Sequence, residues 1–164
     1  MSAYFTRFAF ATATICAIAA PASAQTIARK DLSVDAAVVI ATTAMADCKA
    51  KGWPVSVAVV GRNGELLVHM RGDGTGPHTM DNSYRKAYTA RTSRQASGEM
   101  AKRLKADPQL SLVTLPNMVA AQGALPIKIG EDTIGAAGAS GAPGGEKDEA
   151  CIQTGLDKIK DQLK

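Results

Sequence analysis

The stretch VSVAVVGRNGELLVHM, from Val55 to Met70, decides the fold class of this chain. Residues 55–60 and 65–70 are short runs rich in Val and Leu, and this pattern predicts two strands. Between them stand Asn63 and Gly64, which both tolerate a positive φ angle, so the pair predicts a tight β-hairpin. Strands that follow one another through a hairpin favour an antiparallel sheet over a sheet built from βαβ units.

Three further extended runs follow in the second half of the chain. They span Met118–Gln122, Leu125–Ile129 and Thr133–Ala139. Pro126 has no backbone N–H to donate, so it predicts an edge position for the middle run. Together with the first hairpin, these runs predict a mainly antiparallel sheet of about five strands.

Helical patterns surround the strands. Ser33 is expected to cap a first helix, whose apolar residues recur on one face until Gly52 ends it. A second helix is expected from about Asp81 to Ala96, a short one from Glu99 to Lys105, and a last one from near Lys147. This order predicts an α+β fold in which the helices pack on one sheet.

The first 24 residues have the pattern of a secretory signal peptide. Arg7 precedes a charge-free, mostly apolar run from Phe8 to Ala20, and residues 21–24 end in a small-residue cleavage pattern before Gln25. An uncleaved anchor is the alternative, but the run is short for a membrane span. We therefore expect export to the periplasm or the exterior, no stable membrane insertion, and a single domain over residues 25–164.

Composition narrows the partners of this domain. The signal segment holds one of the 19 basic residues and none of the 15 acidic ones, so the rest of the chain is only mildly basic and does not suggest nucleic-acid binding. All three Phe residues lie in the signal segment. The remaining aromatic residues are Trp53, Tyr84 and Tyr88, so the core must be built mainly from aliphatic side chains.

Two cysteines remain once the signal segment is set aside. Cys48 falls on the first predicted helix and Cys151 on the last one. Export and an even count favour a disulfide between them, which requires these two helices to lie side by side. The alternative is a pair of small buried residues on two helices.

The common catalytic signatures are missing from the sequence. It contains no nucleophile elbow, no H-E-x-x-H motif and no paired-cysteine zinc spacing. The glycines between 135 and 145 are not followed by G-K-[ST], so they do not form a P-loop. The acids have local roles instead, with Asp148 and Glu149 expected in the first turn of the last helix.

Both histidines belong to the segment from Val68 to Asn82. His78 lies on a loop just before a predicted helix start, where free N–H groups and the helix dipole favour anions. His69 and Met70 end the second strand, and either could bind a metal or haem iron. The cations Arg71, Arg85 and Lys86 add positive charge nearby, so a ligand with carboxylates and a metal centre would use this region. The alternatives are a solvated loop histidine at 78 and a half-buried strand histidine at 69.

Seven segments form an ordered set that covers nearly all of the chain after residue 24: GWPVSVAVV (52–60), NGELL (63–67), MRGDG (70–74), KAYTA (86–90), GALPI (123–127), IGAAGASG (134–141) and DEAC (148–151). As a set they resemble the GlcG/HbpS-type family, also known as the haem-degrading or haem-binding domain family. The chain departs from the family pattern at Gly61, where Asp is common, and at Gly123-Ala124, where a glycine pair is common. The resemblance implies an α+β fold, homo-oligomers, and haem binding in some members.

Three functions follow from these observations. The first is an exported haem-binding protein, which handles or senses haem, with His78 or His69 as metal ligand. Met70, Arg71, Arg85 and Lys86 are the other expected ligand-binding residues. The second is a module without catalysis that binds a non-haem, anionic small molecule or serves as an accessory subunit. An enzyme that degrades haem ranks third, because the sequence offers no evident acid–base pair.

Overall fold

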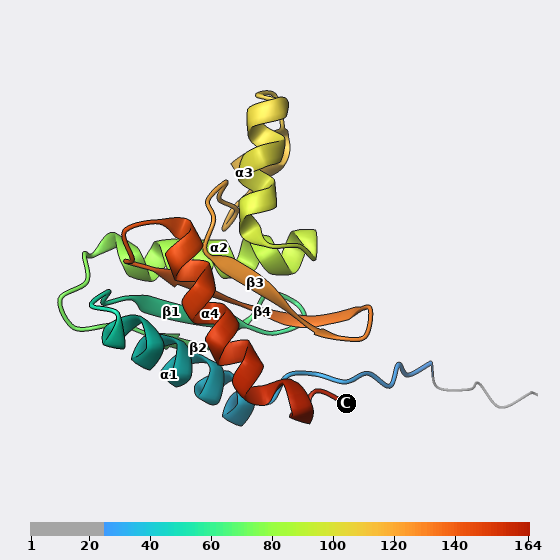
Figure 1. Ribbon diagram of the computed structural model, residues 1–164. Coiled ribbons are helices and arrows are strands. Elements are labelled where there is room, and N and C mark those ends of the chain that lie inside the picture. The colour runs from blue at the N-terminus through green and yellow to red at the C-terminus, as the bar shows by residue number, and fades with distance from the viewer. Residues whose placement is uncertain (1–24) are drawn as a thin grey trace, which may run out of the picture.

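A four-stranded antiparallel sheet with the order β2-β1-β4-β3 forms the centre of the fold. The computed structural model describes residues 25–164, and the predicted signal peptide lies outside the described residues. Helices α1 and α4 cover one face of the sheet, and α2 covers the other (Figure 1). The elements are α1 (Val34–Ala50), β1 (Ser56–Val60), β2 (Leu66–Met70), α2 (His78–Ser93), α3 (Ser97–Ala106), η1 (Ser111–Thr114), β3 (Ala124–Ile129), β4 (Asp132–Ser140), α4 (Gly145–Ile159) and η2 (Lys160–Gln162).

The two faces of the sheet contain different side chains. Alternation along β1 sends Val57 and Val59 into a large aliphatic core under α1 and α4. The opposite face is lined by small residues, because α2 lies very close to it. A Cβ atom at Gly138 would come within 2.6 Å of the Ser83 carbonyl oxygen. Small side chains therefore replace the missing aromatic residues by letting helix and sheet approach each other.

The hairpin joins β1 to β2 as predicted, but its turn differs from the expected one. Gly64 has a φ of +81°, whereas Asn63 is not among the residues with positive φ. The Gly61 N–H donates to the Glu65 carbonyl, and the pairing register shifts between Val59 and Val60. A single left-handed glycine with a register shift is typical of a longer turn with a bulge.

The sheet has four strands, so the predicted strand at residues 118–122 is wrong. The backbone there bonds to side chains of α2 rather than to a neighbouring strand. Arg85 donates to the Met118 carbonyl at 2.8 Å, and the Val119 N–H donates to the Thr89 hydroxyl at 2.9 Å. Pro126 was assigned correctly, since β3 is an edge strand.

Helix boundaries agree with the sequence in one place and differ in another. Ser33 caps α1, and its hydroxyl accepts a hydrogen bond from the Ala36 N–H at 3.2 Å. Helix α2 begins at His78, three residues before the predicted start at Asp81. Pro77 already has helical angles, with φ −61° and ψ −29°, so the helix starts directly after it. His78 is therefore the first helical residue rather than a loop residue.

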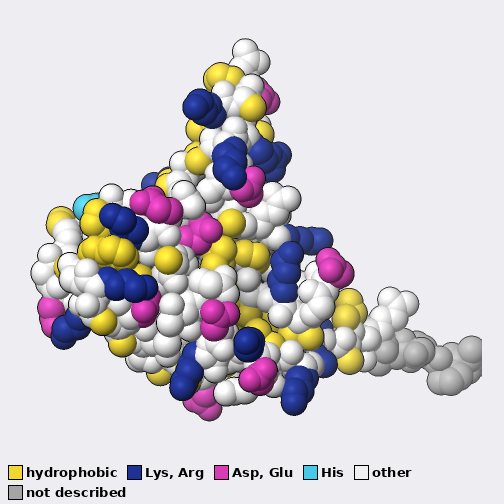
Figure 2. Space-filling view, viewed as in Figure 1, with side chains coloured by type: hydrophobic (Ala, Val, Ile, Leu, Met, Phe, Trp, Pro, Cys, Tyr) yellow, Lys and Arg dark blue, Asp and Glu magenta, His cyan; other side chains and the backbone are white. Residues whose placement is uncertain are grey.

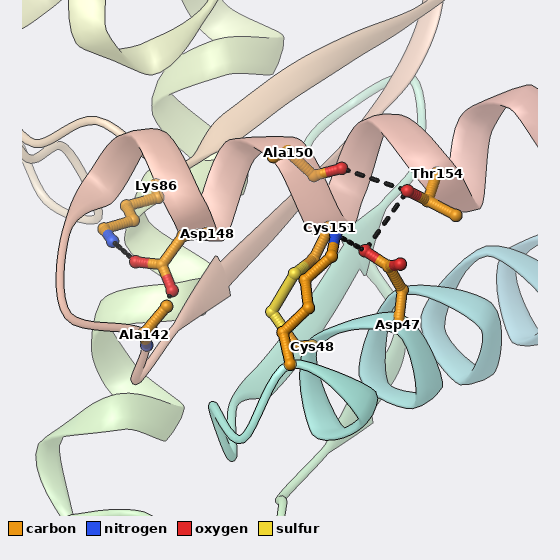
Figure 3. Close-up of a disulfide and its surroundings, with 9 residues drawn as sticks. Asp47, Cys48, Lys86, Ala142, Asp148, Ala150, Cys151 and Thr154 are labelled. Atoms are coloured by element: carbon orange, nitrogen blue, oxygen red, sulfur yellow. Dashed lines mark hydrogen bonds and ion pairs between the residues drawn. A yellow bond between two sulfur atoms is a disulfide. The ribbon is translucent and has the colours of Figure 1, made fainter.

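A disulfide joins Cys48 of α1 to Cys151 of α4, which confirms the predicted bond (Figure 3). Both residues are fully buried in the aliphatic core. The Cα atoms lie 5.6 Å apart and close a loop with a sequence separation of 103 residues. The bond fixes the last turns of α1 against the first turns of α4.

Two features complete the outline of the molecule. Helix α3 and the segment after it project from the body as an arm (Figure 1). Leu115 in this arm is 52% exposed. Among residues 25–164, no helix has the length and apolar character that crossing a membrane requires.

Candidate functional site

Helices α2 and α4 begin at the same end of the sheet (Figure 1), and a cleft lies between their first turns. We call this the polar cleft. Its volume is about 370 Å³, and the loops around Thr75 and Ala142 form its rim. The side chains that line it are Pro54, Thr75, His78, Thr79, Asn82, Lys86, Ser140, Ala142, Pro143 and Asp148.

A buried ion pair forms part of the wall of the polar cleft (Figure 3). The Lys86 ammonium of α2 donates to Asp148 Oδ2 of α4 at 2.7 Å and to the Ala139 carbonyl at 3.1 Å. The two side chains are only 5% and 4% exposed. The other carboxylate oxygen of Asp148 accepts from the Ala142 N–H at 3.0 Å. The pair therefore connects α2, β4, α4 and the loop that rims the cleft.

Burial raises the pKa of Asp148 above that of an ordinary aspartate, because water no longer solvates the carboxylate. The hydrogen bonds from Lys86 and Ala142 act in the opposite direction and only partly offset this effect. A buried charge of this kind persists only when it is paired and hydrogen-bonded. Asp148 therefore depends on Lys86, and the two residues act as one unit.

Hydroxyl groups occupy the rest of the cleft wall. Ser56 Oγ lies 2.8 Å from Thr79 Oγ1 and 3.3 Å from Thr75 Oγ1. Asn82 donates to the Ser140 hydroxyl at 3.0 Å, which joins the first turn of α2 to the end of β4. The wall is therefore largely polar, and none of its lining residues is aromatic apart from the imidazole of His78.

The two histidines differ in what they contact. His69 Nε2 lies 2.9 Å from the Met80 carbonyl and 3.3 Å from Ser83 Oγ, so this imidazole is held beneath α2 and outside the cleft. His78 is exposed at the mouth of the cleft, and its ring packs over Gly76. Among residues 25–164, no side chain or backbone group hydrogen-bonds to the His78 ring. His78 is thus the imidazole available to a ligand or a metal ion.

The other expected ligand-binding residues lie apart from His78 and Lys86. Arg71 donates to the Thr75 carbonyl at 2.9 Å, and Arg85 donates to Met118 and faces Asp81 at 3.6 Å. Met70 packs against the aliphatic core. The structure therefore brings His78 and Lys86 together in the polar cleft and places Arg71, Arg85 and Met70 elsewhere.

Sequence reasoning missed Asp148, Asn82 and Ser140 as cleft residues. Asp148 was assigned to the first turn of a helix, where an acid is common. One signal was present, since Asp148 stands three residues before Cys151 and so shares the buried face of α4. An acid on a buried helix face needs a partner.

A second hollow, the apolar groove, lies beside the cleft and shares Pro54 with it. Its volume is about 350 Å³. Met45, Pro54 and Val55 contribute apolar surface, while Lys49 and Arg71 also line it. Figure 2 shows apolar side chains bordered by Lys and Arg at this end of the molecule. Among the described residues, no group of three or more His, Cys, Asp or Glu side chains could hold a metal ion.

The fold and the cleft define a small α+β domain with a polar cleft at one end of its sheet. The family described as haem degrading protein HbpS-like matches residues 32–157, which is most of the chain. The chain belongs to this HbpS-like family, as its sequence resemblance indicated. Among curated protein sequences, none matches the chain.

Solved structures agree with this assignment. The crystal structure of HbpS is 34% identical, with a TM-score of 0.78, and the alignment covers 87% of this chain and 99% of that one. The protein ORFY of Klebsiella pneumoniae is 25% identical, with a TM-score of 0.75 and coverage of 83% and 96%. The PduOC:haem complex is 22% identical, with a TM-score of 0.73 and coverage of 79% and 96%, and it supports the fold alone.

Proposed function

We propose that this chain is an exported haem-binding protein whose iron ligand is His78. The chain belongs to a family of haem-related proteins, and the freedom and position of His78 are the observation that carries the proposal. His78 is an exposed imidazole without a hydrogen-bond partner among the described residues, and it stands at the mouth of a cleft at the start of α2. His69 lacks this freedom, because its Nε2 atom already contacts Met80 and Ser83.

The residues of this region fit part of a haem group. His78 would hold the iron through an imidazole nitrogen, and bound haem would supply a redox-active iron centre. The first turn of α2 and the Lys86 ammonium favour the negative charge of a propionate. The polar cleft does not suit a porphyrin ring, whereas the neighbouring apolar groove offers aliphatic surface with Lys49 and Arg71 beside it. The apolar groove would therefore hold the porphyrin ring, and the polar cleft would hold a propionate.

Export and self-association belong to this proposal. The signal-like segment 1–24 supports a periplasmic or secreted location, and the Cys48–Cys151 disulfide is consistent with an oxidising compartment. A second copy of the chain would cover a porphyrin that one copy leaves exposed. Size-exclusion chromatography is expected to show an oligomer, and a monomer at working concentrations would contradict this.

Titration of the protein with hemin, followed at the Soret band, tests haem binding. The unaltered protein is expected to show a saturable shift. His78→Ala should weaken or alter this shift, whereas His69→Ala is the matched control and should retain it. The absence of a saturable shift would end the haem proposal, and an unchanged spectrum in His78→Ala would remove His78 as ligand.

A non-haem small molecule is the second candidate, and the polarity of the cleft favours it. Apolar and aromatic surfaces line most pockets for flat hydrophobic ligands, but hydroxyl, amide and charged groups line this one. Failure of hemin to bind, together with binding of a polar anion, would support this alternative. Loss of haem absorbance with a reductant and oxygen would instead indicate haem degradation.

A further inference from the structure

One donor of the buried Lys86 ammonium has no acceptor in the protein. An ammonium group carries three N–H donors. Asp148 Oδ2 and the Ala139 carbonyl accept two of them, at 2.7 and 3.1 Å. No other atom of residues 25–164 accepts a hydrogen bond from Lys86. Because this side chain lines the polar cleft, an oxygen atom inside the cleft can reach the third donor.

Ser140 provides a second buried donor in the same cleft. The residue is only 3% exposed, and its hydroxyl accepts from Asn82 at 3.0 Å. Within the described part of the chain, nothing accepts the hydroxyl hydrogen of Ser140. Lys86 Nζ and Ser140 Oγ already have partners in the protein, and each keeps one hydrogen that can be donated to an acceptor entering the cleft.

The first turns of α2 and α4 beside the cleft also favour a hydrogen-bond acceptor there. Neither α2 nor α4 has a side-chain cap at its first turn. Gly145, the first residue of α4, lines the cleft. In these first turns the Lys147 N–H already donates to the Gly144 carbonyl and the Thr79 N–H to the Gly76 carbonyl. The helix dipoles still place partial positive charge at the cleft.

We propose that the floor of the polar cleft binds the carboxylate of a small organic monoanion, with Lys86 and Ser140 donating to its two oxygens. The donors and the two helix starts favour a carboxylate, whereas the negative charges of Asp148 and Glu146 disfavour a second charge on the ligand. The cleft volume of about 370 Å³ leaves room for the organic part of the molecule. This site shares Lys86 with the proposed propionate contact, but it rests on Lys86 and Ser140 and not on His78, so it stands even if hemin does not bind.

Backbone amide NMR of the purified protein, titrated with acetate, acetamide and inorganic phosphate, tests the site. Acetate is expected to produce saturable shifts at residues 140–146 and 78–82. Acetamide keeps the shape without the charge and should produce none. Phosphate carries more charge and should bind more weakly. Tighter binding of phosphate than of acetate would overturn the monoanion proposal, as would acetate shifts confined to other residues.

Two variants test the donors. Lys86→Met combined with Asp148→Asn removes both charges but keeps an acceptor for the Ala142 N–H, so it avoids an unpaired buried charge. Acetate affinity should fall about tenfold or more in this double variant, because hydrogen bonds to charged groups are strong. Ser140→Ala leaves the ion pair intact and should weaken acetate binding by a smaller factor. This variant tests the proposal if the double variant does not fold. Lys102→Met on the arm is the control. Unchanged affinity in the cleft variants would overturn the proposal.

Discussion

At the scale of single residues, hydrogen bonding decides which candidate side chains can act. His78 was the better placed of the two histidine candidates in the sequence, and in the structure His69 is held by Met80 while His78 is free at the cleft mouth. Lys86 was expected to add positive charge near a ligand, and in the structure it is buried and paired with Asp148. The sequence shows which residues are neighbours in the chain. The pairing of Lys86 with Asp148, which lies 62 residues away, becomes visible only in the folded structure.

Asp148 is expected to affect the pH dependence of stability with an unusual sign. Its pKa is raised in the folded protein, so the folded state holds this proton more readily than the unfolded state. The contribution of Asp148 to the free energy of unfolding should therefore increase as pH falls from neutrality through the raised pKa. The double variant Lys86→Met/Asp148→Asn, which leaves no unpaired buried charge, lacks this increase and serves as the reference in place of Asp148→Asn alone. Urea unfolding at several pH values measures the difference, and a wild-type protein that loses stability relative to this double variant in this window would contradict it.

Arg62 should produce the opposite trend. It donates to Asp132 at 2.7 and 2.8 Å and to Asp31 at 2.8 Å. The Arg62 hydrogen bond lowers the pKa of Asp132 below the usual value, so this contribution is present above the unfolded pKa and is lost as pH falls through the folded one. Arg62→Met should therefore lose less stability in acid than the unaltered protein. Arg29→Met is the control, because Arg29 makes only an exposed pair with Asp31. Equal acid sensitivity of Arg62→Met and the unaltered protein would refute the assignment.

At the scale of elements, local chemistry predicted what local contacts determine. The Ser33 cap, the hairpin and the edge position of Pro126 depend on neighbouring residues, and each was found. Residues 118–122 look like a strand, but side chains of α2 bind their backbone. Helix α2 begins three residues before its predicted start at Asp81, because Pro77 initiates it. The glycine-rich segment before Pro77 shows no helical pattern that would have predicted this start.

The disulfide joins two elements and supports the site. Cys151 lies one turn after Asp148 on α4, so the bond to Cys48 holds the helix that supplies the cleft carboxylate (Figure 3). Replacing both cysteines with Ala should lower the free energy of unfolding by about 2–4 kcal/mol, because the bond restricts the unfolded chain. Urea unfolding measures this loss. A count of two reactive thiols in the native, unaltered protein would contradict the bond itself.

At the scale of the whole molecule, the sequence predicted the fold class and the family but only half of the site. An ordered set of motifs was enough to place the chain in the HbpS-like family. The cleft forms between two connections, the loop from β2 into α2 and the loop from β4 into α4. These two connections lie far apart in the chain, and Lys86 and Asp148 are separated by 62 residues. Only the three-layer arrangement brings them together.

The crystal structure of the protein with hemin tests the central claim most directly. Haem is expected at the end of the molecule where α2 and α4 begin, with its iron bound to the His78 imidazole. Iron bound by His69 or Met70, or haem seated on the projecting arm formed by α3 and η1, would contradict it.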